Sequence, residues 1–249
     1  PTYRRPQPLS ITATPDIHHT QAPTAHTKHG LAAARSLTSL GHVEQRLGRI
    51  DQAAKHIGTA VTTFRQAGDR EGEGFALYNL GRVEARRGDL DSATAYHRAA
   101  LGAFREVGSQ AGEAWALDGI GGVELRSGRI ENAAVHFQAA LALFRELGYQ
   151  DGMPWALNRL GETALAGNRP AEALAVHVAA LDSGDRGQQA RAHKGLGLAH
   201  RALGDPDLAR EHLTAALATY EEFGLPEADE VRIHLADLAA HSEAASEIG

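Results

Sequence analysis

The chain has 249 residues, a formal net charge of −6, 43% hydrophobic residues and only 5% aromatic residues. It has no cysteine, which excludes disulfides, thiolate metal sites and cysteine nucleophiles and fits a reducing compartment, so we expect a cytoplasmic protein. The acidic balance argues against direct nucleic-acid binding, because phosphate contacts need a basic surface. No apolar run approaches the roughly 20 residues of a membrane span. The alanine-rich composition predicts an all-α fold.

Residues 1–27 differ in composition from the rest of the chain. They contain five of the nine prolines and show no helical periodicity, which predicts a flexible tail or linker. Histidines in and beside this segment could capture a metal ion, but adventitious binding is the favoured interpretation: they are His18, His19, His26 and His29. Because the first residue is proline rather than methionine, we expect a processed chain or a fragment of a longer protein.

From about residue 28 to residue 241 the sequence repeats itself. Four segments that begin 40 residues apart, at Leu37, Leu77, Leu117 and Leu157, align with one another. They are LTSLGHVEQRLGRIDQAAKH, LYNLGRVEARRGDLDSATAY, LDGIGGVELRSGRIENAAVH and LNRLGETALAGNRPAEALAV. A fifth copy begins 36 residues later at His193. A half-unit from Pro226 predicts a capping helix at about 226–241, with 242–249 as a short C-terminal tail. Five copies in register predict an α-solenoid of helix-turn-helix units.

Each unit is predicted to contain two helices, because in the third unit apolar residues recur at three- and four-residue spacing over 115–125 and 130–144. Glycines that need positive φ are expected where the helices end. These are Gly48, Gly88, Gly128, Gly167 and Gly204 after the first helix, and Gly68, Gly108, Gly148 and Gly224 after the second. Another recurring set is Gly41, Gly81, Gly121, Gly161 and Gly197. Glycine inside a helix costs about 1 kcal/mol relative to alanine, so these glycines predict close helix crossings.

The Leu/Ile-Gly pair, the glycine turn and the following Ala-x3-(large)-x2-Ala resemble the tetratricopeptide repeat over about residues 31–241. That resemblance implies a right-handed superhelix of helix pairs, although the unit is 40 residues rather than 34 and the usual closing proline is absent. Two segments, ALALFRELGYQDGMPWALNRLGE and ALATYEEFGLPEADEVRIHL, resemble the C-terminal repeats of actinobacterial regulators of the Streptomyces antibiotic regulatory protein (SARP) type. This implies a sensor or interaction arm whose DNA-binding and nucleotide-binding domains lie elsewhere.

Motifs of enzymes are missing from the sequence, which has no P-loop, no HExxH and no GxSxG. The segments GIGGVE and GLGLAH half-match a dinucleotide fingerprint, but neither follows a strand, so we interpret their glycines as packing residues. His97 and His177 share one second-helix position. Ligands on neighbouring repeats would stand roughly 10 Å apart, too far to share one ion at bonds of about 2 Å. We therefore predict packing histidines and a non-enzymatic protein without metal or cofactor.

The first helices of a repeat stack line its concave face, and the positions predicted to point into it carry aromatic and arginine residues. The predicted partner-binding residues are Phe75, Tyr78, Asn79, Arg82, Arg86, Trp115, Asp118, Arg126, Trp155, Asn158 and Arg159. Aromatic and arginine side chains are the preferred anchors of binding hot spots. The arginines indicate a ligand with carboxylates, such as an acidic or aromatic-containing peptide segment or another domain of the parent protein.

Three other interpretations stay open at this stage. Phe75, Trp115 and Trp155 can simply pack, while late-helix arginines meet the helix dipole. The domain can sense a small molecule held between the two tryptophans. It can also be a structural or self-association module whose groove is filled by its own residues 1–27. Finally, the fourth repeat is four residues short, which predicts a change of curvature or a hinge near residues 183–187.

Overall fold

The computed structural model describes residues 25–182 and 184–248, without the side chains of 25–28, 46 and 241–248. The predicted tail therefore lies, up to residue 24, outside the described residues, as does Ser183 of the predicted hinge. The regular elements of this range are all α-helices: α1 (Ala25–Arg46), α2 (Ile50–Ala67), α3 (Arg70–Arg87), α4 (Leu90–Val107), α5 (Gln110–Arg126), α6 (Ile130–Glu146), α7 (Gly152–Ala166), α8 (Pro170–Ala180), α9 (Arg186–Leu203), α10 (Pro206–Glu222) and α11 (Glu227–Ile248).

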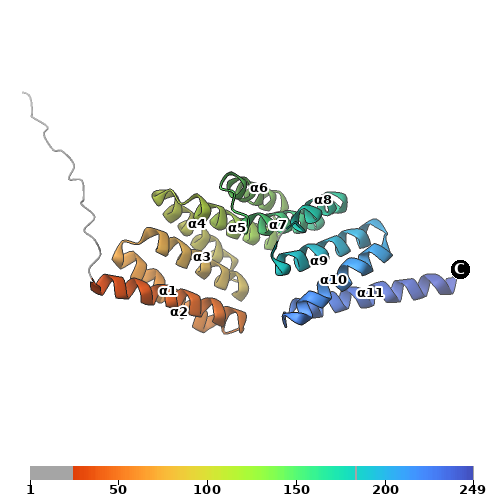
Figure 1. The fold of residues 1–249 in the computed structure, drawn as a ribbon, viewed down its shortest axis with the longest axis horizontal. Helices are drawn as coiled ribbons and strands as arrows, with labels where there is room; N and C mark the ends of the chain where they lie inside the picture. Colours follow the sequence, from red (N-terminus) through yellow and green to blue (C-terminus); the bar gives the residue numbers. More distant parts are fainter. Residues whose placement is uncertain (1–24, 183, 249) are drawn as a thin grey trace, which may run out of the picture.

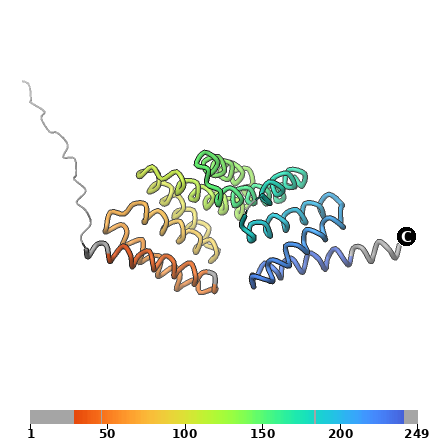
Figure 2. The backbone as a smooth tube through the Cα atoms, in the orientation of Figure 1, coloured from red at the N-terminus to blue at the C-terminus, as the bar shows by residue number. Residues whose placement is uncertain are grey.

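The helices form a solenoid of pairs, which confirms the predicted all-α class. Each helix packs against the next one along the chain, from α1 on α2 to α10 on α11. The first helices α1, α3, α5, α7 and α9 also contact one another in order, so they form one continuous layer. The pairs follow an arc, with α1 and α11 at its two ends (Figure 1). The last turn of α1 and the start of α11 face each other across the opening of the arc (Figure 2).

The helix crossings fall where the recurring glycines predict them. A Cβ atom on Gly41, Gly81, Gly121, Gly161 or Gly197 would lie within 2.3 to 2.7 Å of a side chain on the second helix of the same repeat. The side chains that fill these spaces are Ile57, His97, Phe137, His177 and Leu213. We call them knob residues; none is more than 1% exposed. The two histidines are thus fully buried packing residues, in agreement with the sequence interpretation.

Helix ends follow the predicted glycines with one exception. Gly167 has a φ of −85°, and the following Asn168 takes the left-handed conformation instead, with a φ of 57°. Asparagine tolerates this region because its short polar side chain bonds locally. The shortened repeat is confirmed, since α8 has 11 residues where α2 and α4 each have 18; the hinge remains a prediction. α11 continues to Ile248, beyond the end predicted at residue 241.

Candidate functional site

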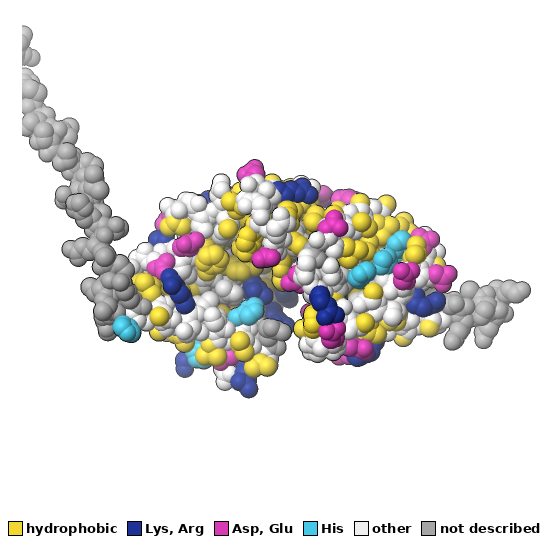
Figure 3. Space-filling view, in the orientation of Figure 1, with side chains coloured by type: hydrophobic (Ala, Val, Ile, Leu, Met, Phe, Trp, Pro, Cys, Tyr) yellow, Lys and Arg dark blue, Asp and Glu magenta, His cyan; other side chains and the backbone are white. Residues whose placement is uncertain are grey.

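The concave face holds three adjoining cavities, all bordered by Trp155. The arginine cavity has a volume of about 290 Å³, and Arg82, Arg86, Arg126 and Arg159 lie in its wall. The aromatic shelf beside it has about 210 Å³ and includes Phe75, Tyr78, Asn79 and Trp115. The C-terminal cavity has about 590 Å³ and lies between α7, α9 and the start of α11. Figure 3 shows the molecule hollowed between the two ends of the arc, with basic side chains inside the hollow.

All predicted site residues except Asn158 line the arginine cavity or the aromatic shelf. Asn158 was expected to face the groove, and this is wrong: its side chain is fully buried. Its Nδ2 donates to the main-chain oxygen and to Oε1 of Gln188, at 3.0 and 3.1 Å, and its Oδ1 lies 3.1 Å from Nδ1 of His177. The helix aims this position at the neighbouring α8 and α9, where it joins two repeats instead of meeting solvent.

The aromatic residues of the shelf pack against each other and also line the groove. The Trp115 ring lies edge-on to Phe144, Trp155 and Tyr149, at centroid distances of 5.0, 6.1 and 6.3 Å. These distances are those of favourable aromatic pairs. Since Trp115 and Trp155 already touch, no ligand fits between them, so the predicted sandwich of a small molecule is wrong in this geometry. Phe75, with 38% exposure, stays open at the edge of the shelf.

Two of the cavity arginines reach back to the preceding repeat. Arg86 donates from Nη1 to the main-chain oxygen of Gln45 at 3.0 Å, and Arg126 donates in the same way to that of Ala85. Both acceptors belong to the last turn of a helix and already accept the N–H of the glycine that ends it, Gly48 or Gly88. Each guanidinium therefore adds a second hydrogen bond there and meets the negative end of the helix dipole. Arg82 instead lies over the Tyr78 ring, 5.8 Å from its centroid. Burial raises the pKa of Tyr78 to about 12, so its hydroxyl remains protonated.

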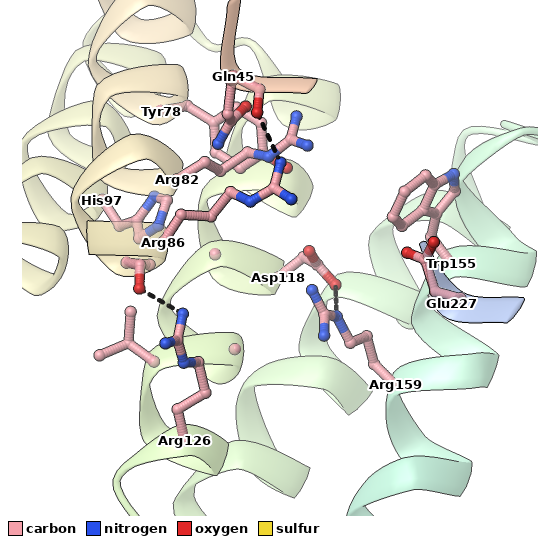
Figure 4. A pocket seen from close by; sticks show the side chains of 14 residues that line it. Gln45, Tyr78, Arg82, Arg86, His97, Asp118, Arg126, Trp155, Arg159 and Glu227 are labelled. Atoms are coloured by element: carbon pink, nitrogen blue, oxygen red, sulfur yellow. Dashed lines mark hydrogen bonds and ion pairs between the residues drawn. The ribbon is translucent and has the colours of Figure 1, made fainter. Parts of the chain in front are cut away.

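Two buried polar side chains form the floor of the arginine cavity (Figure 4). Asp118 is 4% exposed, and its Oδ1 has no hydrogen-bond partner within the described residues; the Arg159 Nε lies 3.8 Å away. Burial raises the pKa of the Asp118 carboxyl, against the charges of Arg159, Arg191 and Arg82. His97 Nδ1 likewise finds no partner among the described side chains. Burial, aided by the charge of Arg82, lowers the pKa of His97 to about 4, so the ring is neutral near pH 7.

The basic residues of the C-terminal cavity, by contrast, are paired with carboxylates of the chain. Glu162 accepts two hydrogen bonds from Arg191, at 2.6 and 2.7 Å, and lies 3.5 Å from Arg159. Lys194 meets Glu230 at 3.0 Å. Burial acts to raise the pKa of Glu162, but the charge and hydrogen bonds of Arg191 outweigh it and lower that pKa to about 2. The groove is thus neutralised at its C-terminal end and basic in its middle.

Sequence reasoning missed the second role of His97 and the presence of Glu227 in the site. His97 was assigned to packing alone, yet it also borders the arginine cavity. Glu227 comes from the start of α11, outside the periodic register, and lines both the arginine and C-terminal cavities. One signal was available: Gly119 recurs as Gly195 once the shorter fourth repeat is allowed for. A Cβ on either glycine would lie within 2.5 Å of a knob histidine.

The described residues include no group of three or more histidine, aspartate or glutamate side chains that could hold a metal ion. Across the same part of the chain, no helix combines the length and the apolar character needed to cross a membrane.

Family comparisons agree with this architecture. One tetratricopeptide repeat model matches residues 32–106 and 112–183, and a second matches residues 158–222 and 194–247. The chain belongs to the tetratricopeptide repeat family. Repeats of this family typically mediate protein–protein interactions. A search of curated proteins finds no match.

Solved structures of other repeat proteins share the fold of this tetratricopeptide repeat chain. The thermophilic TPR protein TTC0263 of Thermus thermophilus is 18% identical over 84% of this chain and 100% of that one, with a TM-score of 0.62. BtubC from P. vanneervenii is 17% identical over 81% and 93%, with a TM-score of 0.55. A chain of the Cut9–Hcn1 hetero-tetramer of the APC/C is 19% identical over 87% and 40%, with a TM-score of 0.67. At these identities the likeness concerns the fold alone.

Proposed function

We propose that this repeat domain is a non-enzymatic binding module that holds an acidic segment of a protein partner along its concave face. One observation carries the proposal: Arg82, Arg86 and Arg126 line a single cavity, and none forms an ion pair with a carboxylate of the described chain. Most other arginines of the domain are paired, as Arg70 is with Glu73 and Glu106. Unpaired arginines beside exposed aromatic surface are typical of a binding hot spot.

We also propose a context for the module, on the resemblance of its repeats to those of SARP-type regulators. The domain would be the sensor or regulatory arm of a cytoplasmic multidomain transcriptional regulator, in which the bound segment biases a switch between closed and active states. The similar chain of the Cut9–Hcn1 hetero-tetramer was solved within a protein assembly, which is consistent with such a partner-binding role. Reading the gene upstream of the codon for Pro1 tests this context. Open coding sequence for an activator and a nucleotide-binding domain is expected; a start codon directly before Pro1 would contradict it.

Site-specific photo-crosslinking tests the binding face itself. A photoreactive amino acid replaces Asn79, which borders the aromatic shelf, or, as the matched control, Gln138 on the exposed side of α6. After irradiation in cells, mass spectrometry identifies the captured peptides. We expect captured segments rich in acidic residues from position 79 and not from position 138. Equal capture at both positions, or capture at 138 alone, would refute a concave binding face.

A further inference from the structure

We infer that the groove reads two side chains of the partner together: an aromatic ring on the aromatic shelf and a carboxylate in the arginine cavity. This inference rests on the proposed function and specifies its ligand. The two cavities share Tyr78, Arg82 and Trp155 as common walls, so the two seats are immediate neighbours. In an extended segment, residues i and i+2 project to the same side. The expected motif is therefore an aromatic and an acidic residue separated by one residue.

The carboxylate seat is prepared before any ligand arrives. Arg86 and Arg126 come from different helices, and each is fixed through one Nη1 by a main-chain oxygen of the preceding repeat. The remaining N–H groups of each guanidinium are left for a ligand, because a guanidinium has five donors. Side chains that are already ordered lose less entropy on binding. Arg82, held against the Tyr78 ring, adds a third cation without a carboxylate partner in the described chain.

The buried floor of the arginine cavity indicates a peptide rather than a simple anion. Asp118 Oδ1 and His97 Nδ1 are buried without a hydrogen-bond partner among the described residues; the Arg159 Nε, at 3.8 Å from Asp118 Oδ1, gives an ion pair only. A missing hydrogen bond is costly unless a ligand or water supplies one. An ionised carboxylate accepts hydrogen bonds only, so Asp118 calls for a donor. A main-chain N–H beside the acidic side chain provides that donor, whereas a fully deprotonated oxyanion such as sulfate provides only more acceptors. The combination of arginines around an acidic floor thus fits a peptide with a carboxylate side chain.

Ion pairs in the rest of the groove leave only the arginine cavity for the carboxylate of the partner. In the C-terminal cavity, Arg191 is bonded to Glu162 and Lys194 to Glu230. A partner carboxylate placed there would have to break an existing pair. In the arginine cavity it breaks none, and Glu227 stands on the opposite wall. The acidic residue is therefore expected over α3 and α5, not over α7 and α9.

Peptide binding measured by fluorescence anisotropy tests this inference. The probe is a fluorescein-labelled glycine/serine peptide with one phenylalanine-glycine-glutamate motif, used in this order and in reverse. Two variants replace the glutamate with glutamine or the phenylalanine with alanine. The protein is tested unchanged, as Arg82→Met, and as the control Arg98→Met, since Arg98 is exposed on α4 and lines none of the three cavities. Methionine keeps an unbranched apolar stem against Tyr78, and the peptide variants leave the protein untouched.

We expect one peptide order to bind. The glutamine substitution should weaken binding about tenfold or more, the size of a lost charge-assisted bond, and the alanine substitution should weaken it by a similar factor through lost apolar contact. Arg82→Met should reduce the preference for glutamate over glutamine, since Arg86 and Arg126 remain, while Arg98→Met leaves it unchanged. Equal binding of the glutamine peptide, or no binding of either order, overturns the inference. Tighter binding of an oligo-deoxythymidine of similar length would also overturn it and indicate nucleic acid. If crosslinking from residue 79 still captures a partner segment, the proposed function survives that failure.

Discussion

The buried knob residue His97 should make the stability of the domain fall between pH 7 and pH 5. Its pKa is near 6.5 in the unfolded chain and about 4 in the folded one. The unfolded state therefore binds a proton first as the pH drops, and stability is lost from about pH 6.5 downwards until the folded pKa is reached. The two values give a loss of about 2 kcal/mol at pH 5 relative to pH 7, on the scale of 1.36 kcal/mol per pKa unit.

Replacing His97 by phenylalanine isolates this contribution. Phe137 fills the equivalent space against Gly121, so a phenylalanine suits the site. The groups that face His97 do not obscure the window, because Tyr78 titrates far above it, at about 12. Asp118, whose pKa burial raises, borders the same cavity but is present in both proteins, so its titration cancels in the comparison. The variant should thus lose about 2 kcal/mol less than the unchanged protein between pH 7 and pH 5.

Urea unfolding followed by far-UV circular dichroism at pH 7, 6 and 5 measures this difference. Repeat arrays need not unfold in one step, so the slope of each transition must be checked before midpoints are compared. Using the change with pH within each protein removes the packing difference between histidine and phenylalanine. The control is His136→Phe, on the half-exposed surface of α6. If His97→Phe retains the full pH dependence, or His136→Phe removes as much of it, the account of a buried neutral histidine is refuted.

Four further substitutions test the packing. Gly102→Ala should stabilise by about 1 kcal/mol, because its Cβ would meet nothing within 4 Å, and a lower melting temperature would contradict this. Gly119→Ala, the same change made 2.5 Å from His97, should destabilise by about 1–3 kcal/mol, so a gain like that of Gly102→Ala would be contrary evidence. Trp115→Ala should cost about 3 kcal/mol in thermal unfolding; a loss of binding at full stability would show that its ring contacts are dispensable. Asn158→Ala should cost about 2 kcal/mol by leaving buried partners unpaired, and an unchanged melting temperature would refute that network.

Periodicity predicted the fold well because each repeat imposes the same physical demand. A glycine at 41, 81 or 121 is needed wherever a knob side chain enters the space of its Cβ, and that demand recurs with the unit. The same periodicity placed the shelf and arginine residues correctly on the concave face. It failed at Asn158, because a one-repeat offset keeps the helical direction but not the depth of burial. There His177 of α8 and Gln188 of α9 bond to the side chain and bury it.

Contacts between distant parts of the chain could not be read from the repeats. Glu227 enters the arginine cavity because the arc brings the start of α11 towards the end of α1, and curvature accumulates over all the repeats. The pairing of Glu162 with Arg191 crosses from α7 to α9 and decides which half of the groove stays basic. Neither contact has a sequence signature, since both depend on the angle at which successive pairs stack.

The arginine cavity depends on which knob residue lies beneath it and on which residue of the next first helix faces that knob. Where the knob is Ile57 or Phe137, the facing position on the next first helix carries Asn79 or Arg159. Where the knob is His97, that position is Gly119, whose Cβ would lie 2.5 Å from the imidazole. Because Gly119 has no side chain, it makes room for the imidazole of His97 on the side of the core. It also leaves the floor of the groove without a side chain at this position. In this way one buried histidine borders the cavity from below, and the glycine that makes room for it keeps open the space that the arginines surround.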